Sequence, residues 1–268
     1  DDAIPSLEVS DEGTYRIVTV YLDYSSDFVD DDENKDFRIV SDEILYSIGE
    51  LATEIEESLI KIHNQTHYVE NRGSLGHLQS QFNIAYMYEN GLGIAQDFNK
   101  ALKWYRKAAE QGDAEAKFRL ALSYDSGEGV SQDHGEAMMW YRSAAEDGHD
   151  DAQNNLANMF EFGRGVAEDF KEAFEWYSKA AAQNNVYAQS NLANVFRSGR
   201  GVDQNFVEAV KLYRKAAEQG DVNAQNSLGT MYHNGQGVPL NYEEAVNWYR
   251  KAAGQGNAES QFNLALCC

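Results

Sequence analysis

A period of 36 residues dominates this sequence, and the same residue types return at that interval from residue 77 onward. The recurring positions include a glycine (Gly93, Gly129, Gly165, Gly201 and Gly237), a tyrosine (Tyr105, Tyr141, Tyr177, Tyr213 and Tyr249) and a leucine (Leu120, Leu156, Leu192, Leu228 and Leu264). A fixed period of roughly 20–50 residues is typical of a stacked array, in which each unit buries its apolar face against its neighbours. The sequence therefore predicts a repeat solenoid over residues 76–268.

Within each repeat, the pattern predicts two antiparallel helices. In the second repeat, Ala116, Leu120 and Tyr124 share one stripe of a first helix over about residues 116–124. Gly127 is expected to end this helix, because glycine adopts the left-handed C-cap conformation without strain. The second helices are expected to begin at the N-cap residues Asp97, Asp133, Asp169, Asn205 and Asn241. Glutamates stand three residues later, as a capping box requires, at Glu136, Glu172, Glu208 and Glu244. The buried face of the second helices is expected to carry Trp104, Trp140, Trp176, Leu212 and Trp248.

The recurring phrase is Gly-x-Gly-Val…Asp-x-x-x-Ala-x-x-Trp-Tyr-x-x-Ala-Ala…Gly-x-x-x-Ala-Gln-x-x-Leu-Ala-x-x-Tyr. This phrase resembles the Sel-one-like repeat, a relative of the tetratricopeptide repeat. The resemblance covers about residues 77–268, as five full repeats and a final unpaired helix, and does not extend to residues 1–75. It implies a right-handed α-solenoid that serves as a scaffold, an adaptor or a peptide-binding surface. It also favours an exported protein, in the periplasm, the secreted fraction or the lumen of the endoplasmic reticulum, over a cytoplasmic one.

Three positions depart from the repeat, and one of them is Ser260, which replaces the small alanine of the first helix. Asn184 replaces the glycine between the two helices, and asparagine tolerates the same backbone conformation. Cys268 falls where the other first helices have an aromatic residue, and the sequence stops inside that helix. Because terminal repeats normally need a polar cap, we expect either that the protein continues or that another chain, such as a second copy, covers this end.

Residues 1–75 differ in pattern from the repeats, so a domain boundary is expected near residues 73–76. β-Branched and aromatic residues fill residues 14–24, which predicts a strand, and residues 37–40 are a second candidate strand. Ser41 is a candidate N-cap. An amphipathic helix is predicted by Ile44, Ile48, Leu51, Ile55, Leu59 and Ile62, which recur at helical spacing. We therefore expect a small α/β segment before the solenoid.

The net charge of −22 is unevenly distributed along the chain. Residues 1–75 contain 19 acidic and 5 basic residues, a net charge of −14, which leaves −8 for the repeats. This excess of acid argues against a protein that coats nucleic acid, because each phosphate contact needs Lys or Arg. No stretch approaches the roughly 18 apolar residues of a membrane span. The expected partner is therefore a protein or peptide, without nucleic acid and without membrane insertion.

The motifs give no indication of catalysis, of a cofactor or of a bound metal. The repeated glycines follow helices rather than strands, which indicates helix caps and not a phosphate-binding loop. Counted from Asp30, the sixth and twelfth positions of a calcium-binding EF-hand loop, which need glycine and glutamate, hold Lys35 and Ser41, so the Asp30–Asp36 run is expected to be a solvated loop. His63 and His67 could share a helix face but lack a third ligand, and the adjacent Cys267 and Cys268 exclude a disulfide framework.

The surface that remains is the exposed side of the first helices. Gln81, Ile84, Ala85 and Tyr88 share one side of the first of these helices, so the opposite side is expected to face outward. By resemblance to tetratricopeptide solenoids, this side lines a concave groove. The candidate groove residues are Asn83, Tyr86, Arg119, Leu122, Asn155, Asn158, Phe162, Tyr187, Asn191 and Asn194. The asparagines suit an extended peptide because an amide both donates and accepts hydrogen bonds, and the alternative is that they only solvate a helix face.

Three hypotheses about function follow from these features. The leading one is a non-enzymatic adaptor that binds a protein segment in the groove of the solenoid. The second is an acidic inhibitor or immunity-type protein, whose charged residues 1–75 cover a basic partner. The third, from a different class, is a hydrolase acting on a cell-wall-related substrate, which would need a nucleophile or paired carboxylates converging in a cleft.

Overall fold

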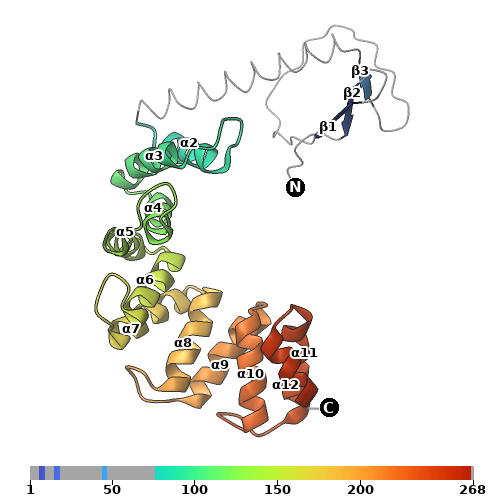
Figure 1. Cartoon of the computed structure of the whole chain (residues 1–268). Helices are drawn as coiled ribbons and strands as arrows, with labels where there is room; N and C mark the ends of the chain where they lie inside the picture. The colour runs from blue at the N-terminus through green and yellow to red at the C-terminus, as the bar shows by residue number, and fades with distance from the viewer. Residues whose placement is uncertain (1–5, 10–14, 19–43, 47–75, 267–268) are drawn as a thin grey trace. The chain divides into compact units, whose positions relative to one another are not determined.

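A computed structural model of the chain describes residues 6–9, 15–18, 44–46 and 76–266. The chain divides into two compact units, Asp1–Tyr68 and Val69–Cys268. The first unit contains a small sheet and the second contains the helices (Figure 1).

The sheet of the first unit has three antiparallel strands in the order β1 (Ser6–Val9), β2 (Tyr15–Val18) and β3 (Ile44–Tyr46). Ile17 of β2 lies opposite Leu7 on one side and Ile44 on the other. β2 confirms a strand within residues 14–24, whereas the helix expected from Ile44 is wrong at its start. Ile44 and Tyr46 pair with β2 instead, since β-branched and aromatic side chains suit a pleated strand. Ser41, residues 37–40 and the remainder of the predicted helix lie outside the described residues.

The second unit consists of helices in consecutive antiparallel pairs, each pair packed on the next (Figure 1). The first helices of the pairs are α2 (Leu78–Asn90), α4 (Ala114–Ser126), α6 (Asp150–Phe162), α8 (Val186–Ser198), α10 (Val222–Asn234) and α12 (Ala258–Leu266). The second helices are α3 (Phe98–Glu110), α5 (His134–Glu146), α7 (Phe170–Ala182), α9 (Phe206–Glu218) and α11 (Tyr242–Gly254). The predicted α-solenoid is confirmed.

The predicted caps form at both ends of the turn between the two helices of a repeat. Gly127 ends α4 in the left-handed conformation, with φ of 78°. The side chain of Asp133 begins α5 and accepts hydrogen bonds from the backbone N–H groups of Gly135 at 2.9 Å and Glu136 at 3.1 Å. The reciprocal half of the capping box is not made, because the N–H of Asp133 donates to the carbonyl of Tyr124 in the preceding helix at 2.9 Å. The turn therefore folds back onto the last turn of the helix before it.

The second glycine of each Gly-x-Gly turn is required by packing between repeats. Gly201 has φ of 74°, and a Cβ atom at this position would lie only 2.7 Å from both the carbonyl carbon and the Cβ of Phe170. Phe170 is the first residue of α7, so this turn rests on the second helix of the preceding repeat. The glycine is thus needed for its conformation and also for the close approach.

Small and aromatic side chains alternate in the core. The alanines at Ala144, Ala180 and Ala216 are fully buried, which allows neighbouring helices to approach closely. The repeated tyrosines Tyr105, Tyr141, Tyr177, Tyr213 and Tyr249 are buried as well. The predicted tryptophan stripe is only partly buried: Trp176 and Trp248 are in the core, but Trp104, Trp140 and Leu212 are half-exposed. Lysines one turn later lie over the rings of Trp104, Trp176 and Trp248, so this stripe borders the surface.

A side-chain pair links each second helix to the first helix of its own repeat, near the turn to the next one. In four repeats the pair is two glutamines: Gln111 with Gln81, Gln183 with Gln153, Gln219 with Gln189 and Gln255 with Gln225. In the second repeat the same two positions hold Lys117 and Asp147, whose charged groups lie 2.5 Å apart. An ion pair therefore substitutes for the amide pair there.

Candidate functional site

The first-helix face is the unburied side of α2, α4, α6, α8, α10 and α12. On α2, the predicted inward residues Gln81, Ile84, Ala85 and Tyr88 are all buried. The candidate residues lie on the other side, and each retains some exposure: Asn83, Tyr86, Phe162 and Tyr187 are exposed, and Arg119, Leu122, Asn155, Asn158, Asn191 and Asn194 are half-buried. All ten predicted residues therefore belong to first helices and keep some exposure to solvent.

Hydroxyl groups of the repeated tyrosines reach this face from the second helices. Tyr213 of α9 donates to the amide oxygen of Asn194 at 2.6 Å and accepts from Nε of Arg197 at 3.0 Å. Both partners belong to α8. The hydroxyl therefore reaches from the second helix of this repeat to side chains on the exposed side of its first helix.

Carboxylates accept hydrogen bonds from the tyrosine hydroxyls in the first and third repeats. Tyr105 donates to Glu89 at 2.6 Å. Tyr177 lies 2.6 Å from the amide oxygen of Asn158 and 2.7 Å from Oε2 of Glu161, and its single proton can go to only one of them at a time. Burial, and then the hydrogen bond to Glu161, raise the pKa of Tyr177, so its hydroxyl remains a donor.

The sign of the charge beside the tyrosine changes along the face. The repeat position that holds Glu89, Asp125 and Glu161 in the first three repeats holds Arg197 in the fourth. Since Arg197 can only donate, Tyr213 directs its own proton to Asn194. The amide oxygen of Asn194 is thereby occupied, and within the described part of the chain its amide nitrogen has no hydrogen-bond partner.

Two of the other predicted asparagines, Asn155 and Asn191, are both hydrogen-bonded to Asn154, a buried residue of α6 that was not among the predicted residues. Asn155 donates to the hydroxyl of Tyr141 at 3.3 Å and accepts from Asn154 at 3.2 Å. Asn191 donates to the amide oxygen of Asn154 at 3.0 Å, which connects α8 to α6. These amides join consecutive repeats, so they stabilise the array in addition to facing the solvent.

Arg119 is held within an internal cluster of charges. Its guanidinium contacts Glu115 at 2.8 Å and Glu89 at 3.8 Å. Glu115 also contacts Nε2 of His149 at 2.8 Å, and the His149 ring stacks on Phe118. The hydrogen bond from His149 lowers the pKa of the Glu115 carboxyl. Burial lowers the pKa of His149, but the Glu115 carboxylate outweighs it, and the net pKa is raised.

Apolar side chains on the same face are exposed to solvent. Phe162, at the end of α6, is 59% exposed, and Tyr187, near the start of α8, is 64% exposed. Tyr86 of α2 is 41% exposed, and Leu122 of α4 is half-buried. Large apolar groups on the rim of a polar face are typical of protein interaction surfaces.

The tyrosine hydroxyls were not anticipated as part of this face. The sequence assigned the tyrosines to the core, and their rings are indeed buried. The available signal was that tyrosine, rather than phenylalanine, stands at this position in every repeat, since a buried hydroxyl needs a polar partner. Without the hydroxyls, nothing in the sequence marked the charged residues beside them as part of this face, namely Glu89, Asp125, Glu161 and Arg197.

The sequence also offered glycine turns, candidate metal ligands and cysteines to compare with the structure. The glycines Gly91 and Gly127 are helix C-caps, as expected, and each makes the left-handed turn that ends a first helix. Among the described residues, no three His, Cys, Asp or Glu side chains are grouped to hold a metal ion. No helix in the same ranges is long and apolar enough to cross a membrane. The Asp30–Asp36 run, His63 with His67, and Cys267 with Cys268 lie outside the described residues.

Comparison with known proteins identifies the repeat. The Sel1 repeat model matches residues 78–113, 114–149, 150–185, 186–221 and 222–257. A protective antigen of uropathogenic Escherichia coli strains, displaying an SLR fold, is 36% identical over 74% of this chain with a TM-score of 0.71, and the match spans 42% of the antigen. A Sel1 repeat protein from Oxalobacter formigenes is 34% identical, with a TM-score of 0.68, over 78% of this chain and 85% of its own length. No functionally curated protein matches the sequence.

Proposed function

We propose, from the premise that the chain belongs to the Sel1 repeat family, that it is a non-enzymatic scaffold whose first-helix face binds an extended segment of a partner protein. Solenoids of this repeat commonly mediate protein–protein interaction, and stacked repeats create long concave surfaces suited to that task. The proposal adds that the groove is the binding surface and that its ligand is an extended segment.

The observation that carries the proposal is the orientation of Asn194. Its amide oxygen is held by the Tyr213 hydroxyl at 2.6 Å, and Tyr213 is held in turn by Arg197. The amide nitrogen is left as an oriented donor on a partly exposed face. An oriented donor loses little conformational entropy when it binds a peptide carbonyl, and such preorganisation favours affinity.

The spacing of the repeats also suits an extended chain. Packed helices lie roughly 8–10 Å apart, and an extended peptide advances about 3.3 Å per residue. Successive first helices pack on the second helix between them rather than directly on each other, so equivalent positions on them lie further apart than this and would meet peptide residues at least three positions apart. Asn158 occupies the Asn194 position in the preceding repeat, and it competes with Glu161 for the single proton of Tyr177. A peptide could thus be contacted by two amides one repeat apart.

The exposed aromatics supply apolar contacts for the same ligand. Phe162 and Tyr187 belong to adjacent first helices, α6 and α8, which also carry Asn158 and Asn194. Aromatic side chains of this kind dominate the binding energy of many interfaces, whereas the surrounding polar groups fix the register. We therefore expect the segment to carry apolar side chains beside its hydrogen-bonding backbone.

The test is peptide selection followed by affinity measurement. Peptides selected from a random displayed library on the full chain are measured by calorimetry against the wild type and against Asn194→Ala and Phe162→Ser. Loss of one hydrogen bond predicts an affinity about two- to tenfold weaker for Asn194→Ala. Lys211→Ala, an exposed change on α9, is the matched control and is expected to leave the affinity unchanged. Selected peptides that bind both groove variants as tightly as the wild type would overturn the proposed surface.

A further inference from the structure

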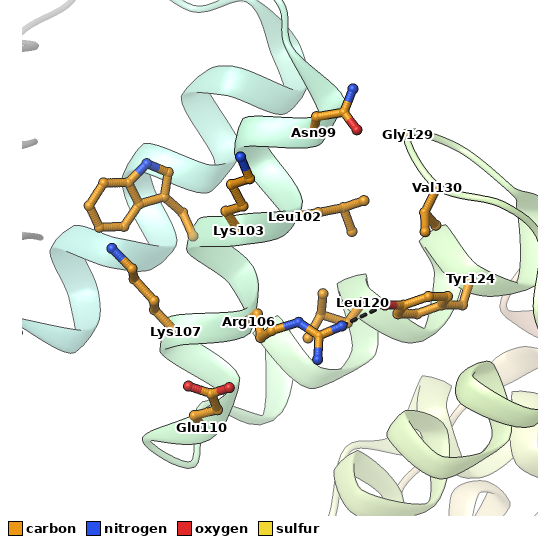
Figure 2. Close-up of a pocket in the computed structure, with 11 residues that line it drawn as sticks. Asn99, Leu102, Lys103, Arg106, Lys107, Glu110, Leu120, Tyr124, Gly129 and Val130 are labelled. Atoms are coloured by element: carbon orange, nitrogen blue, oxygen red, sulfur yellow. Dashed lines mark hydrogen bonds between the residues drawn. The ribbon is translucent and has the colours of Figure 1, made fainter.

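A hollow of about 560 Å³ lies against α3, α4 and the turn that follows α4 (Figure 2). Leu102, Leu120 and Val130 give it an apolar lining, and Lys103, Arg106 and Lys107 supply positive charge beside it. Its volume falls within the roughly 300–1,000 Å³ of pockets that hold small molecules or anchoring side chains.

The helix that forms most of this hollow has an unusual charge for this chain. α3 carries the four basic residues Lys100, Lys103, Arg106 and Lys107 against the single acid Glu110. It is the most basic of the described helices, in a chain whose net charge is −22. At the salt concentration of a cell, charges are screened beyond about 8 Å, so this local patch acts on a bound group more than the distant acids do.

The cations at the hollow have no acidic partner among residues 76–266, the helical part of the chain that the structure describes. Within the described residues, none of Lys103, Arg106 and Lys107 forms an ion pair. Lys211 stands at the same repeat position of α9 as Lys103, and its ammonium pairs with Glu208 at 2.7 Å. The patch on α3 therefore has uncompensated charge where another repeat has an ion pair.

Aromatic rings position two of these cations. The Arg106 guanidinium donates to the hydroxyl of Tyr124, as the dashed line in Figure 2 marks, and lies over the ring of Trp140. The Lys107 ammonium is 3.8 Å from the ring centroid of Trp104. These contacts hold the charged groups at the edge of the hollow without removing their charge.

We propose that this hollow binds a short acidic segment of a partner protein. One aliphatic or aromatic side chain of the segment enters the hollow between Leu102, Leu120 and Val130, and flanking carboxylates contact Lys103 and Lys107. This site is separate from the proposed groove, because it is built mainly on a second helix rather than on the first-helix face. A partner could therefore be held at two surfaces, or two partners could be held at once.

The extent of the patch favours a peptide over nucleic acid. A phosphate backbone requires a continuous track of cations. The next second helix, α5, carries Met139 and Ser143 at the positions of Lys103 and Lys107. Of the three cations at the hollow, α5 keeps only the arginine, as Arg142, so the lysines do not continue as a track. The apolar lining of the hollow also suits a hydrophobic side chain better than a sugar-phosphate chain.

The test is fluorescence anisotropy with the full chain and a short labelled peptide, in which a central leucine is flanked by glutamates. We expect saturable binding that weakens as salt is raised. Lys103→Glu should weaken binding about tenfold, because it replaces an attraction with a repulsion at the hollow. Lys211→Glu is the matched control, since it makes the same exposed charge reversal on α9, and it should leave the affinity unchanged.

Peptide variants separate the two parts of the proposed contact. Replacing the glutamates by glutamine, or the leucine by serine, should each weaken binding to the wild type. The proposal would be overturned if Lys103→Glu and the wild type bound the acidic peptide equally. It would also be overturned if a single-stranded oligonucleotide of similar length bound more tightly than the peptide and with the same dependence on Lys103.

Discussion

The Tyr213 hydroxyl donates a hydrogen bond of 2.6 Å to the amide oxygen of Asn194, and it thereby connects the core of α9 to the exposed face of α8. Tyr105 makes the equivalent contact to Glu89, and Tyr177 makes it to Asn158 or Glu161. One residue type in the repeat therefore serves both packing and the polarity of the surface. The ring fills the core, and the hydroxyl determines which groups on the face are free to bind.

Removal of this hydroxyl should destabilise the solenoid. Tyr213→Phe loses the bonds to Asn194 and Arg197, so we expect the free energy of unfolding to fall by about 1–2 kcal/mol in urea titrations. Tyr187→Phe makes the same chemical change on a side chain that is 64% exposed, and it should cost less than about 0.5 kcal/mol. Equal effects of the two substitutions would show that the buried hydroxyl is not stabilising.

The second glycine of the turn gives a test of packing between repeats. Gly201 and Gly220 both have positive φ, of 74° and 100°. A Cβ at Gly201 would meet the backbone of Phe170, whereas at Gly220 it would meet no atom within 4 Å. Both alanine variants bear a conformational cost of about 1–2 kcal/mol, and Gly201→Ala should lose at least a further 1 kcal/mol. The midpoints of thermal unfolding should therefore differ between the two variants. Equal midpoints would contradict the close approach of Gly201 to Phe170.

The ion pair between Lys117 and Asp147 should be exchangeable for the amide pair of the other repeats. Lys117→Gln alone leaves Asp147 without its cation, and Asp147→Gln leaves a lysine whose side chain is only 12% exposed without its anion. We expect each single change to lower the free energy of unfolding by about 1 kcal/mol and the double change to recover most of the loss. Strictly additive losses in this double-mutant cycle would mean that the two positions do not interact.

The contact between Glu115 and His149 should make stability depend on pH. The raised pKa of His149 contributes stability that is fully present below the unfolded value of about 6.5 and is lost as pH rises through the folded value. The lowered pKa of Glu115 contributes stability that is present above its unfolded value of about 4.3 and is lost as pH falls through the folded value. The pair is therefore strongest between about pH 4.5 and 6.5.

Glu115→Gln tests this dependence. The variant should lose more unfolding free energy relative to the wild type at about pH 6 than at about pH 8.5, because the charged fraction of His149 falls as pH rises. The pKa of His149, followed by NMR titration of its ring protons, should fall in the same variant. A loss of stability that is the same at both pH values would rule out the charged pair as its source.

The helices of the repeats could be predicted because the residues that begin, end and bury each helix lie within that repeat. Capping residues such as Asp133, turn glycines such as Gly127 and the apolar stripes fixed the helices, and five copies of each signal reinforced one another. Asn184 was expected to take the glycine conformation, and its φ of 70° confirms this. The helical phase was correct too, since the side predicted to face inward on α2 is buried.

Contacts between repeats were less accessible to such reasoning. The N–H of Asp133 bonds to the carbonyl of Tyr124, and the turn at Gly201 rests on Phe170, but neither pairing follows from the residues of one helix. The strand at Ile44–Tyr46 was mistaken for a helix start because its residues fit both spacings, and only its pairing with β2 decides between them. At the candidate site, the sequence predicted which asparagines are exposed. It did not predict that the tyrosine hydroxyls orient them, because the tyrosines were assigned to the core.

If Asn194 contacts a bound peptide through its amide nitrogen, NMR of the side-chain amides should detect that contact. With asparagine labelled by ¹⁵N, the selected peptide is titrated into the full chain and the side-chain NH₂ signals are followed. The account predicts a saturable shift of the Asn194 signals, while those of Asn247, exposed on α11, stay in place. A peptide that binds and shifts Asn247 but leaves Asn194 unchanged would contradict the account.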